Sequence, residues 1–207
     1  MCIRDRALTC LLGAALIGLY FLARMFYVLL PFVAFGAVAI LFYTPILSKV
    51  HGLSEIVAGS GFGLMGLGVY VSQSGVVDGA GIAVLVPVSI LVAMLLFLNE
   101  FPDADVDKMA CRRHLVILLG KKRASSVYVA SVTATYVSII LAVAVRAAPP
   151  TTLISVLTTP IAYRACRTVL KDYDRIPNLI SALGANVMVI LSTILLIAVG
   201  FLVGSFI

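Results

Sequence analysis

The residues best suited to chemistry are gathered in one charged segment, Asn99 to Asp107, which lies between two long apolar runs. Asp103 and Asp107 are four residues apart, so in a helix their carboxylates share a face, with about 5–6 Å between the Cβ atoms. Two carboxylates that close repel each other unless a cation lies between them. Mg²⁺ binds one or two carboxylates and takes water and phosphate oxygens as its other ligands. Asp103 and Asp107 are therefore candidate metal ligands, and Asn99, one turn earlier, could supply a neutral oxygen.

Basic side chains follow this segment directly. Lys108, Arg112 and Arg113 carry donors that match phosphate oxygens, and an arginine can bind them with two parallel hydrogen bonds. Carboxylates for a metal beside cations for an anion suit a diphosphate. The alternative interpretation is a solvated loop whose charges neutralise one another. Asp105 is expected to point away from the two candidate ligands, toward solvent or a nearby lysine.

The rest of the chain indicates what holds this segment. Of the 207 residues, 62% are hydrophobic and 12% are charged, and the mean hydropathy is +1.17. A soluble domain of this size does not need so much apolar surface, whereas a helix that crosses a bilayer needs roughly 20 apolar residues. Because unpaired backbone groups are costly in lipid, such long runs must be helical. We predict an all-α polytopic transmembrane bundle of about seven helices, with spans at 7–23, 27–47, 53–73, 79–98, 124–145, 148–163 and 178–205.

The positions of Lys and Arg predict how the bundle lies in the membrane. With seven spans, all of them except Arg24 and Arg146 fall in connections on one side. By the positive-inside rule, the amino end and the aspartate segment face the cytoplasm, in the cell (inner or plasma) membrane. Basic loops held against a membrane favour anionic lipid or an anionic substrate. We therefore expect membrane lipid as a partner and exclude nucleic acid.

Other polar and small residues are assigned roles in packing or at boundaries. His51 and His114 have no carboxylate or second histidine at ligand spacing, so both are interpreted as interfacial residues. Glu55, near the start of the third span, is interpreted as a boundary residue. Gly59 and Gly63 lie four apart in the same span, which is the small-residue spacing that lets helix backbones approach closely. We expect tight helix packing there.

The charged segment also resembles a known motif. The stretch Asn99-Glu-Phe-Pro-Asp103-x-x-x-Asp107-Lys108, followed by Arg112-Arg113-His114-Leu-Val-x-x-Leu-Gly120, resembles the second aspartate-rich motif of the UbiA superfamily of intramembrane prenyltransferases, and within it the MenA-like branch. The chain departs from the family where its usual Gly-Lys-Arg-Thr reads Cys111-Arg112-Arg113-His114. Similar stretches of that branch are Tyr43-Thr-Pro45, Lys49, Gly52-Leu-x-Glu55 and Tyr70-Val-x-Gln73-x-Gly75.

The resemblance implies a nine-helix fold, in which the seven expected helices correspond to helices three to nine. It also implies an earlier Asn-Asp-x-x-x-Asp motif, and this chain contains no such motif. We therefore expect the chain to be truncated at its amino end and inactive alone. Residues 1–6 are either a non-native leader or a short cytoplasmic tail, and residues 7–207 are expected to form a single, incomplete transmembrane domain.

The function implied by the resemblance is Mg²⁺-dependent transfer of a polyprenyl group from polyprenyl diphosphate to an aromatic acceptor. In the MenA-like branch the acceptor is 1,4-dihydroxy-2-naphthoate, a step of menaquinone biosynthesis. Asp103 and Asp107 would hold Mg²⁺, and the diphosphate would be bound by Lys49, Asn99, Lys108, Arg112 and Arg113.

Several alternatives to this function stay open. Within the superfamily the acceptor could instead be 4-hydroxybenzoate, a glycerol-phosphate lipid or a porphyrin. From other classes, the chain could be a non-catalytic seven-helix membrane protein or a transporter. Ion-coupled transporters usually carry ionisable residues inside their spans, and the predicted spans have none away from their ends. This absence disfavours a transporter.

Overall fold

The structure, a computed structural model, describes residues 3–50, 52–110 and 112–207. Met1 and Cys2 of the expected leader, the predicted interfacial His51, and Cys111 of the altered motif lie outside the described residues. The described part of the chain forms eight α-helices, two 3₁₀ helices and no strand. The helices are α1 (Ile3–Arg24), α2 (Phe26–Phe42), η1 (Leu47–Lys49), α3 (Leu53–Ser74), α4 (Gly79–Met109), α5 (Leu115–Leu119), α6 (Lys121–Ala144), η2 (Pro150–Thr158), α7 (Thr159–Asp172) and α8 (Ile176–Gly204).

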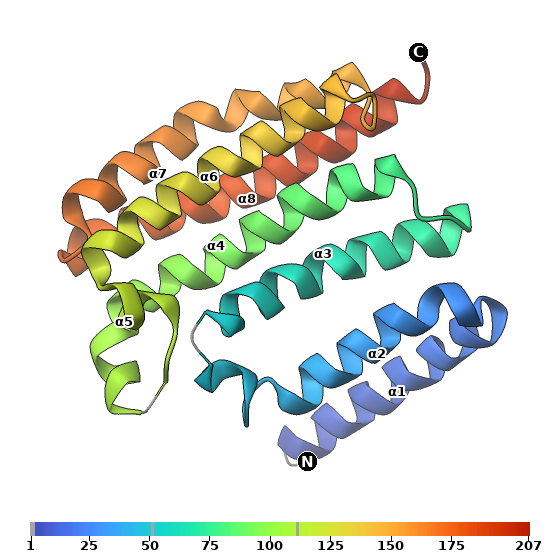
Figure 1. Cartoon of the computed structure of the whole chain (residues 1–207), viewed down its shortest axis with the longest axis horizontal. Helices are drawn as coiled ribbons and strands as arrows, with labels where there is room; N and C mark the ends of the chain where they lie inside the picture. Colours follow the sequence, from blue (N-terminus) through green and yellow to red (C-terminus); the bar gives the residue numbers. More distant parts are fainter. Residues whose placement is uncertain (1–2, 51, 111) are drawn as a thin grey trace.

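The long helices form a bundle in which each one runs back along its predecessor (Figure 1). Five of them, α1, α3, α4, α6 and α8, are long and apolar enough to cross a membrane, and α2 is a shorter apolar helix. The predicted all-α transmembrane bundle is therefore confirmed. The first, third, fifth and seventh predicted spans agree with α1, α3, α6 and α8 to within a few residues.

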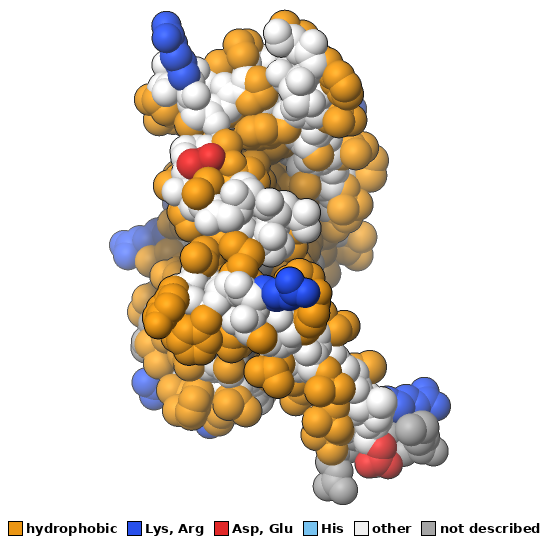
Figure 2. Space-filling model, turned by 90° about the vertical axis from the view of Figure 1, so that its right-hand side faces the viewer, with side chains coloured by type: hydrophobic (Ala, Val, Ile, Leu, Met, Phe, Trp, Pro, Cys, Tyr) orange, Lys and Arg blue, Asp and Glu red, His pale blue; other side chains and the backbone are white. Residues whose placement is uncertain are grey.

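Charge is concentrated at one end of this bundle. The end of α4, the short helix α5, the start of α6 and the connection from α7 to α8 all lie at the left of Figure 1. Together with the loop between α4 and α5, these segments carry seven of the 15 Lys and Arg residues: Lys108, Arg112, Arg113, Lys121, Lys122, Arg123 and Arg175. The opposite end, which faces the viewer in Figure 2, shows mainly hydrophobic side chains and few charged ones. This asymmetry is the one expected from the sequence; which end faces the cytoplasm stays a prediction.

Helix α4 is longer than predicted and includes the whole charged segment. Pro102 lies inside it without ending it. Phe97, Phe101 and Ala104 are buried at helical spacing, so the apolar face that packs against neighbouring helices continues through the charged residues. This packing keeps the aspartate segment helical, although its composition alone indicates a loop.

The sixth predicted span, 148–163, differs most from the structure. The chain forms the 3₁₀ helix η2 there, and α7 then continues beyond the predicted end. The hydroxyls of Thr152, Ser155 and Thr158 each donate to the carbonyl three residues earlier, at 2.7–2.8 Å. Side chains three apart eclipse one another in a 3₁₀ helix, and these three are all buried. Thr158 also forms a 2.8 Å hydrogen bond with Thr193 of α8, which stabilises the tighter helix.

The buried core is centred on α4. Its residues come from α4, α5, α6, α7 and α8, and include Phe97, Phe101, Tyr128 and Val189. A smaller cluster joins α2 to α3. The apolar window of α1 contributes no buried residue. The aspartate segment is thus built on the helix that contributes most residues to this core.

Helices α3 and α4 approach closely at two glycines. Gly59 and Gly63 are both buried. A Cβ atom on Gly59 would collide with the backbone carbonyl of Ser89 and would lie 2.7 Å from Cβ of Ala93. A Cβ atom on Gly63 would collide with the Ser89 hydroxyl and would lie 2.8 Å from Cδ1 of Leu85. The predicted close approach at these glycines is confirmed.

Tyr128 and Asn186 form a buried polar contact between α6 and α8. The Tyr128 hydroxyl donates to Asn186 Oδ1 at 2.8 Å, and both residues are 1% exposed. Tyr128→Phe would leave that oxygen buried without its partner, so we expect the free energy of unfolding to fall by about 1–3 kcal/mol. Thermal melting of the purified protein in detergent measures the loss. Adding Asn186→Leu removes the unpaired oxygen and should restore part of the lost free energy of unfolding. An unchanged melting temperature in Tyr128→Phe would contradict a stabilising hydrogen bond between Tyr128 and Asn186.

Candidate active site

One face of the charged end of α4 carries the candidate metal ligands. Asn99, Asp103 and Asp107, each four residues from the next, line the same cavity of about 130 Å³. The shared face predicted for Asp103 and Asp107 is therefore confirmed. The other walls come from three segments: the connection after α2, the start of α3 and the loop before α5. They include Tyr43, Ser48, Ser54, Arg112 and His114. We call this space the aspartate cavity.

The two aspartates have different surroundings. Asp103 is exposed, and the described residues give it no ion pair or hydrogen bond. The side chain of Asp107 is only 14% exposed; Arg112 Nη1 lies 3.4 Å from its Oδ1, and His114 Nε2 lies 3.4 Å from its Oδ2. Asp107 is thus held in position from two sides, whereas Asp103 is available to a ligand.

His114 is buried, so its prediction as an interfacial residue is wrong. It is 2% exposed, and its Nδ1 lies 3.5 Å from Oε2 of the buried Glu100. Burial lowers the pKa of His114 below its usual value, although the Asp107 carboxylate acts in the opposite direction. Within the described part of the chain, neither ring nitrogen nor Glu100 Oε2 has an aligned hydrogen-bond partner. Buried polar atoms without such partners, beside a cavity, indicate a position for a ligand or a water molecule.

Glu55 lies in the first turn of α3, at the span boundary where it was predicted, and it is buried, at 2% exposure. Its Oε1 accepts a 2.8 Å hydrogen bond from the backbone N–H of Leu115, and its Oε2 accepts one of 2.5 Å from the Ser54 hydroxyl. Glu55 therefore ties the start of α3 to the start of α5 and fixes the loop that carries Arg112 and His114. The only signal in the sequence was a carboxylate at the start of an apolar run, which needs a partner once it is buried.

Three predicted diphosphate ligands do not line the aspartate cavity. Lys108 lies on the other side of α4 with Asp105, where both line a second cavity. Asp105 points away from the candidate ligands, as predicted, and pairs with Lys121 at 3.4 Å. Lys49 and Arg113 are exposed and contribute no atom to the lining. Of the predicted set, the structure brings together Asn99, Arg112 and the two aspartates.

A comparison with protein families decides what kind of protein carries this site. The family model of the UbiA prenyltransferase family matches residues 4–180. The chain belongs to this family. Searches of curated proteins and of solved structures found no match. The UbiA match extends from α1 into α8 and so includes α1 and α2, which precede Tyr43. Membership in the family indicates that the protein is a prenyltransferase.

Mg²⁺ is the cofactor implied by the UbiA resemblance, and the donor set of the aspartate cavity fits it. Among the described residues, no group of three or more His, Cys, Asp or Glu side chains is arranged to hold a metal ion. Besides the buried Glu100, the cavity offers the carboxylates of Asp103 and Asp107 and the amide of Asn99 on a single helix face. Mg²⁺ retains water and binds phosphate oxygens besides one or two carboxylates, so this sparse set suits an ion that is completed by its substrate.

Proposed function

We propose that this UbiA protein transfers a polyprenyl group from polyprenyl diphosphate to an aromatic acceptor, and that the aspartate cavity binds the diphosphate. One observation carries the proposal: Asn99, Asp103 and Asp107 share a face of α4, with Arg112 beside them. A diphosphate leaves readily only when its growing negative charge is neutralised. The aspartate cavity combines ligands for a divalent cation with a guanidinium, at the charged end of a membrane bundle.

The candidate ligands and the charged residues around them have separate roles in this proposal. Asp103 and Asp107 would hold Mg²⁺, with Asn99 as a neutral neighbour, and the bound ion supplies the positive charge that stabilises the leaving diphosphate. Arg112 has an exposed side chain and can donate hydrogen bonds to the departing oxygens. His114 contacts Asp107 and limits the positions that its carboxylate can take. The exposed Lys49 and Arg113 would add positive charge from outside the cavity.

For the acceptor we propose 1,4-dihydroxy-2-naphthoate, in menaquinone biosynthesis, because the aspartate motif resembles that of the MenA-like branch. An electron-rich ring carbon would form the new C–C bond as the C–O bond to the diphosphate breaks, and loss of a proton or of CO₂ from that carbon would restore the aromatic ring. Tyr43, on the cavity wall, can pack against an aromatic ring. The apolar isoprenoid tail would lie along the lipid-exposed helices. We place the cavity on the cytoplasmic side of the cell membrane, since the basic connections lie at the same end.

Binding and transfer are tested separately. A radiolabelled polyprenyl diphosphate is added to the purified chain in detergent, with Mg²⁺ or with EDTA, and bound label is counted after rapid filtration. We expect saturable binding that EDTA removes. Transfer is assayed with the complete gene product and 1,4-dihydroxy-2-naphthoate, 4-hydroxybenzoate, a glycerol-phosphate lipid or a porphyrin. Label in the naphthoate product supports the proposal, label in another product changes the acceptor, and binding without any product favours a non-catalytic protein.

A further inference from the structure

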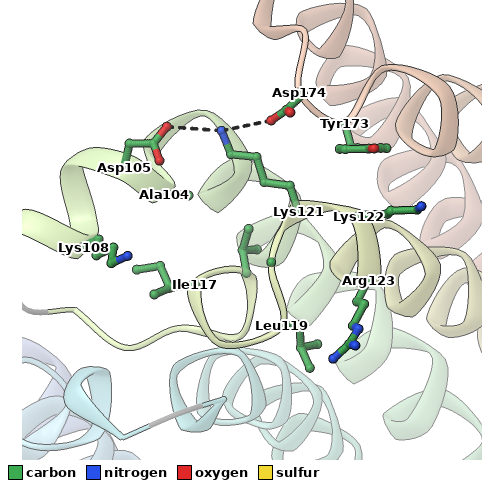
Figure 3. Close-up of a pocket in the computed structure, with 12 residues that line it drawn as sticks. Ala104, Asp105, Lys108, Ile117, Leu119, Lys121, Lys122, Arg123, Tyr173 and Asp174 are labelled. Carbon is green, nitrogen blue, oxygen red and sulfur yellow. Dashed lines mark hydrogen bonds and ion pairs between the residues drawn. The ribbon is translucent and has the colours of Figure 1, made fainter.

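A second and larger cavity lies on the other side of α4. Its volume is about 540 Å³, and its walls come from the end of α4, α5, the start of α6 and the connection from α7 to α8 (Figure 3). We call it the basic cavity, because four cationic side chains and two carboxylates line it: Lys108, Lys121, Lys122, Arg123, Asp105 and Asp174. Nothing in the proposed transfer reaction uses this space.

Only one of the four cations is neutralised. Lys121 Nζ lies 3.4 Å from Asp105 Oδ2 and 3.7 Å from Asp174 Oδ1, as the dashed lines in Figure 3 show. Its side chain is 18% exposed, so Lys121 joins α4 and the α7–α8 connection to the start of α6. Lys122 and Arg123 are exposed, and within residues 3–50, 52–110 and 112–207 they form no ion pair. The same holds for Lys108. The cavity therefore keeps a net positive charge.

The start of α6 makes this surplus charge unfavourable in the absence of an anion. The first three residues of α6 are all basic, and they lie at the positive end of the helix dipole. Gly120 occupies the N-cap position and has no side chain to accept from the first N–H groups. An anion in the cavity would interact favourably with both the side chains and the helix end. The cavity, the unpaired cations and the uncapped helix end all favour the same kind of ligand.

We propose that the basic cavity binds the phosphate group of an anionic phospholipid. A phosphate matches the donors, since lysine binds it as a point charge and arginine through two hydrogen bonds. The remaining walls favour a lipid over a free ion. Apolar side chains of α5, among them Ile117 and Leu119, line the cavity. Val106 and Met109 of α4 and Leu118 of α5 are exposed. Cations beside apolar side chains, at the end of membrane helices, suit a headgroup with its glycerol and upper acyl chain.

Native mass spectrometry of the protein in a neutral detergent tests this proposal. Phosphatidylglycerol is titrated against phosphatidylcholine, and the bound fraction gives the apparent Kd. The variant Lys122→Gln/Arg123→Gln should bind phosphatidylglycerol about thirty-fold more weakly, since each cation near an anionic lipid contributes roughly a factor of five. The matched control is Arg164→Gln/Arg167→Gln, which removes two exposed cations of α7 that line neither cavity. The control should stay within about twofold of the parent, because the phosphate contacts lie elsewhere.

A competition experiment separates lipid from soluble phosphate. Inorganic phosphate is added at millimolar concentration to the phosphatidylglycerol complex. Retained phosphatidylglycerol supports the lipid headgroup as ligand. Displacement by phosphate, together with loss of phosphate binding in Lys122→Gln/Arg123→Gln, supports a phosphate site that is filled from solution. The proposal is overturned if neither probe binds, or if the α7 control weakens binding as much as the cavity variant does. Both variants leave the aspartate cavity intact, so this test is independent of the proposed transfer.

Discussion

Asp107→Asn is expected to lower Mg²⁺-dependent binding of polyprenyl diphosphate by about 100-fold or more, because it replaces one of two metal carboxylates with a neutral amide. The side chain keeps its size, so Phe101 and the rest of the α4 packing should be unaffected. The Kd for radiolabelled diphosphate, measured over a Mg²⁺ titration, and the rate of transfer by the complete gene product report the loss. Near-normal values for both would overturn the metal assignment.

Two further variants show whether the metal is responsible. Asp107 also contacts Arg112 and His114, so its loss could act through them. Asp103 has no such contact among the described residues, and Asp103→Asn should have an effect of the same size. Asp105→Asn removes the same charge from the opposite side of the same helix. This control should retain binding within about threefold, because its carboxylate does not face the aspartate cavity.

The second large effect is expected at the contact between α3 and α4. Gly59→Ala places a methyl group against the Ser89 carbonyl and against Cβ of Ala93, and a backbone atom cannot move aside as a side-chain end can. The helices must separate, so we expect a loss of about 1–3 kcal/mol in the free energy of unfolding. Gly66→Ala, on the same helix, meets nothing within 4 Å and is the control.

Melting temperatures of the two variants in detergent measure this difference. Alanine favours a helix over glycine by up to about 1 kcal/mol, so Gly66→Ala should melt at the parent temperature or slightly above it. Gly59→Ala should melt several degrees below. Equal melting temperatures for the two variants would show that the close approach at Gly59 contributes little to stability. Because α3 supplies Glu55, binding of the diphosphate should weaken together with the packing.

The membrane bundle and the shared face of the aspartates could be predicted because both follow from local patterns. Runs of about 20 apolar residues fix where helices cross lipid, and four-residue spacing puts Asp103 and Asp107 together in any helix. The same geometry separates neighbours in sequence, which is why Lys108 lies with Asp105 and not with Asp107. Asp105 was expected on this other side of the helix, whereas Lys108 was expected beside the diphosphate ligands.

The buried part of the site could not be predicted, because it depends on contacts between distant residues. Glu55 is buried through the N–H of Leu115, 60 residues later in the chain. His114 is buried because Glu100 and Asp107 of α4 lie on either side of it. The local sequence decides neither burial, since a histidine or glutamate next to an apolar run can lie either at a membrane surface or inside a protein. The η2 helix was missed for a similar reason: its hydroxyls stabilise a 3₁₀ geometry only when α8 covers them.

The length of α4 has a consequence for the molecules that the protein can accept. At about 1.5 Å per residue, its 31 residues span roughly 46 Å, which exceeds the hydrocarbon thickness of about 30 Å. Asp103 and Asp107 lie in its last two turns. One continuous helix can therefore hold them outside the hydrocarbon layer while its earlier turns stay within that layer. An amphiphile aligned with α4 would keep its ionic head hydrated and its hydrocarbon tail in the bilayer. The head would not have to enter hydrocarbon, and the tail would not have to enter water.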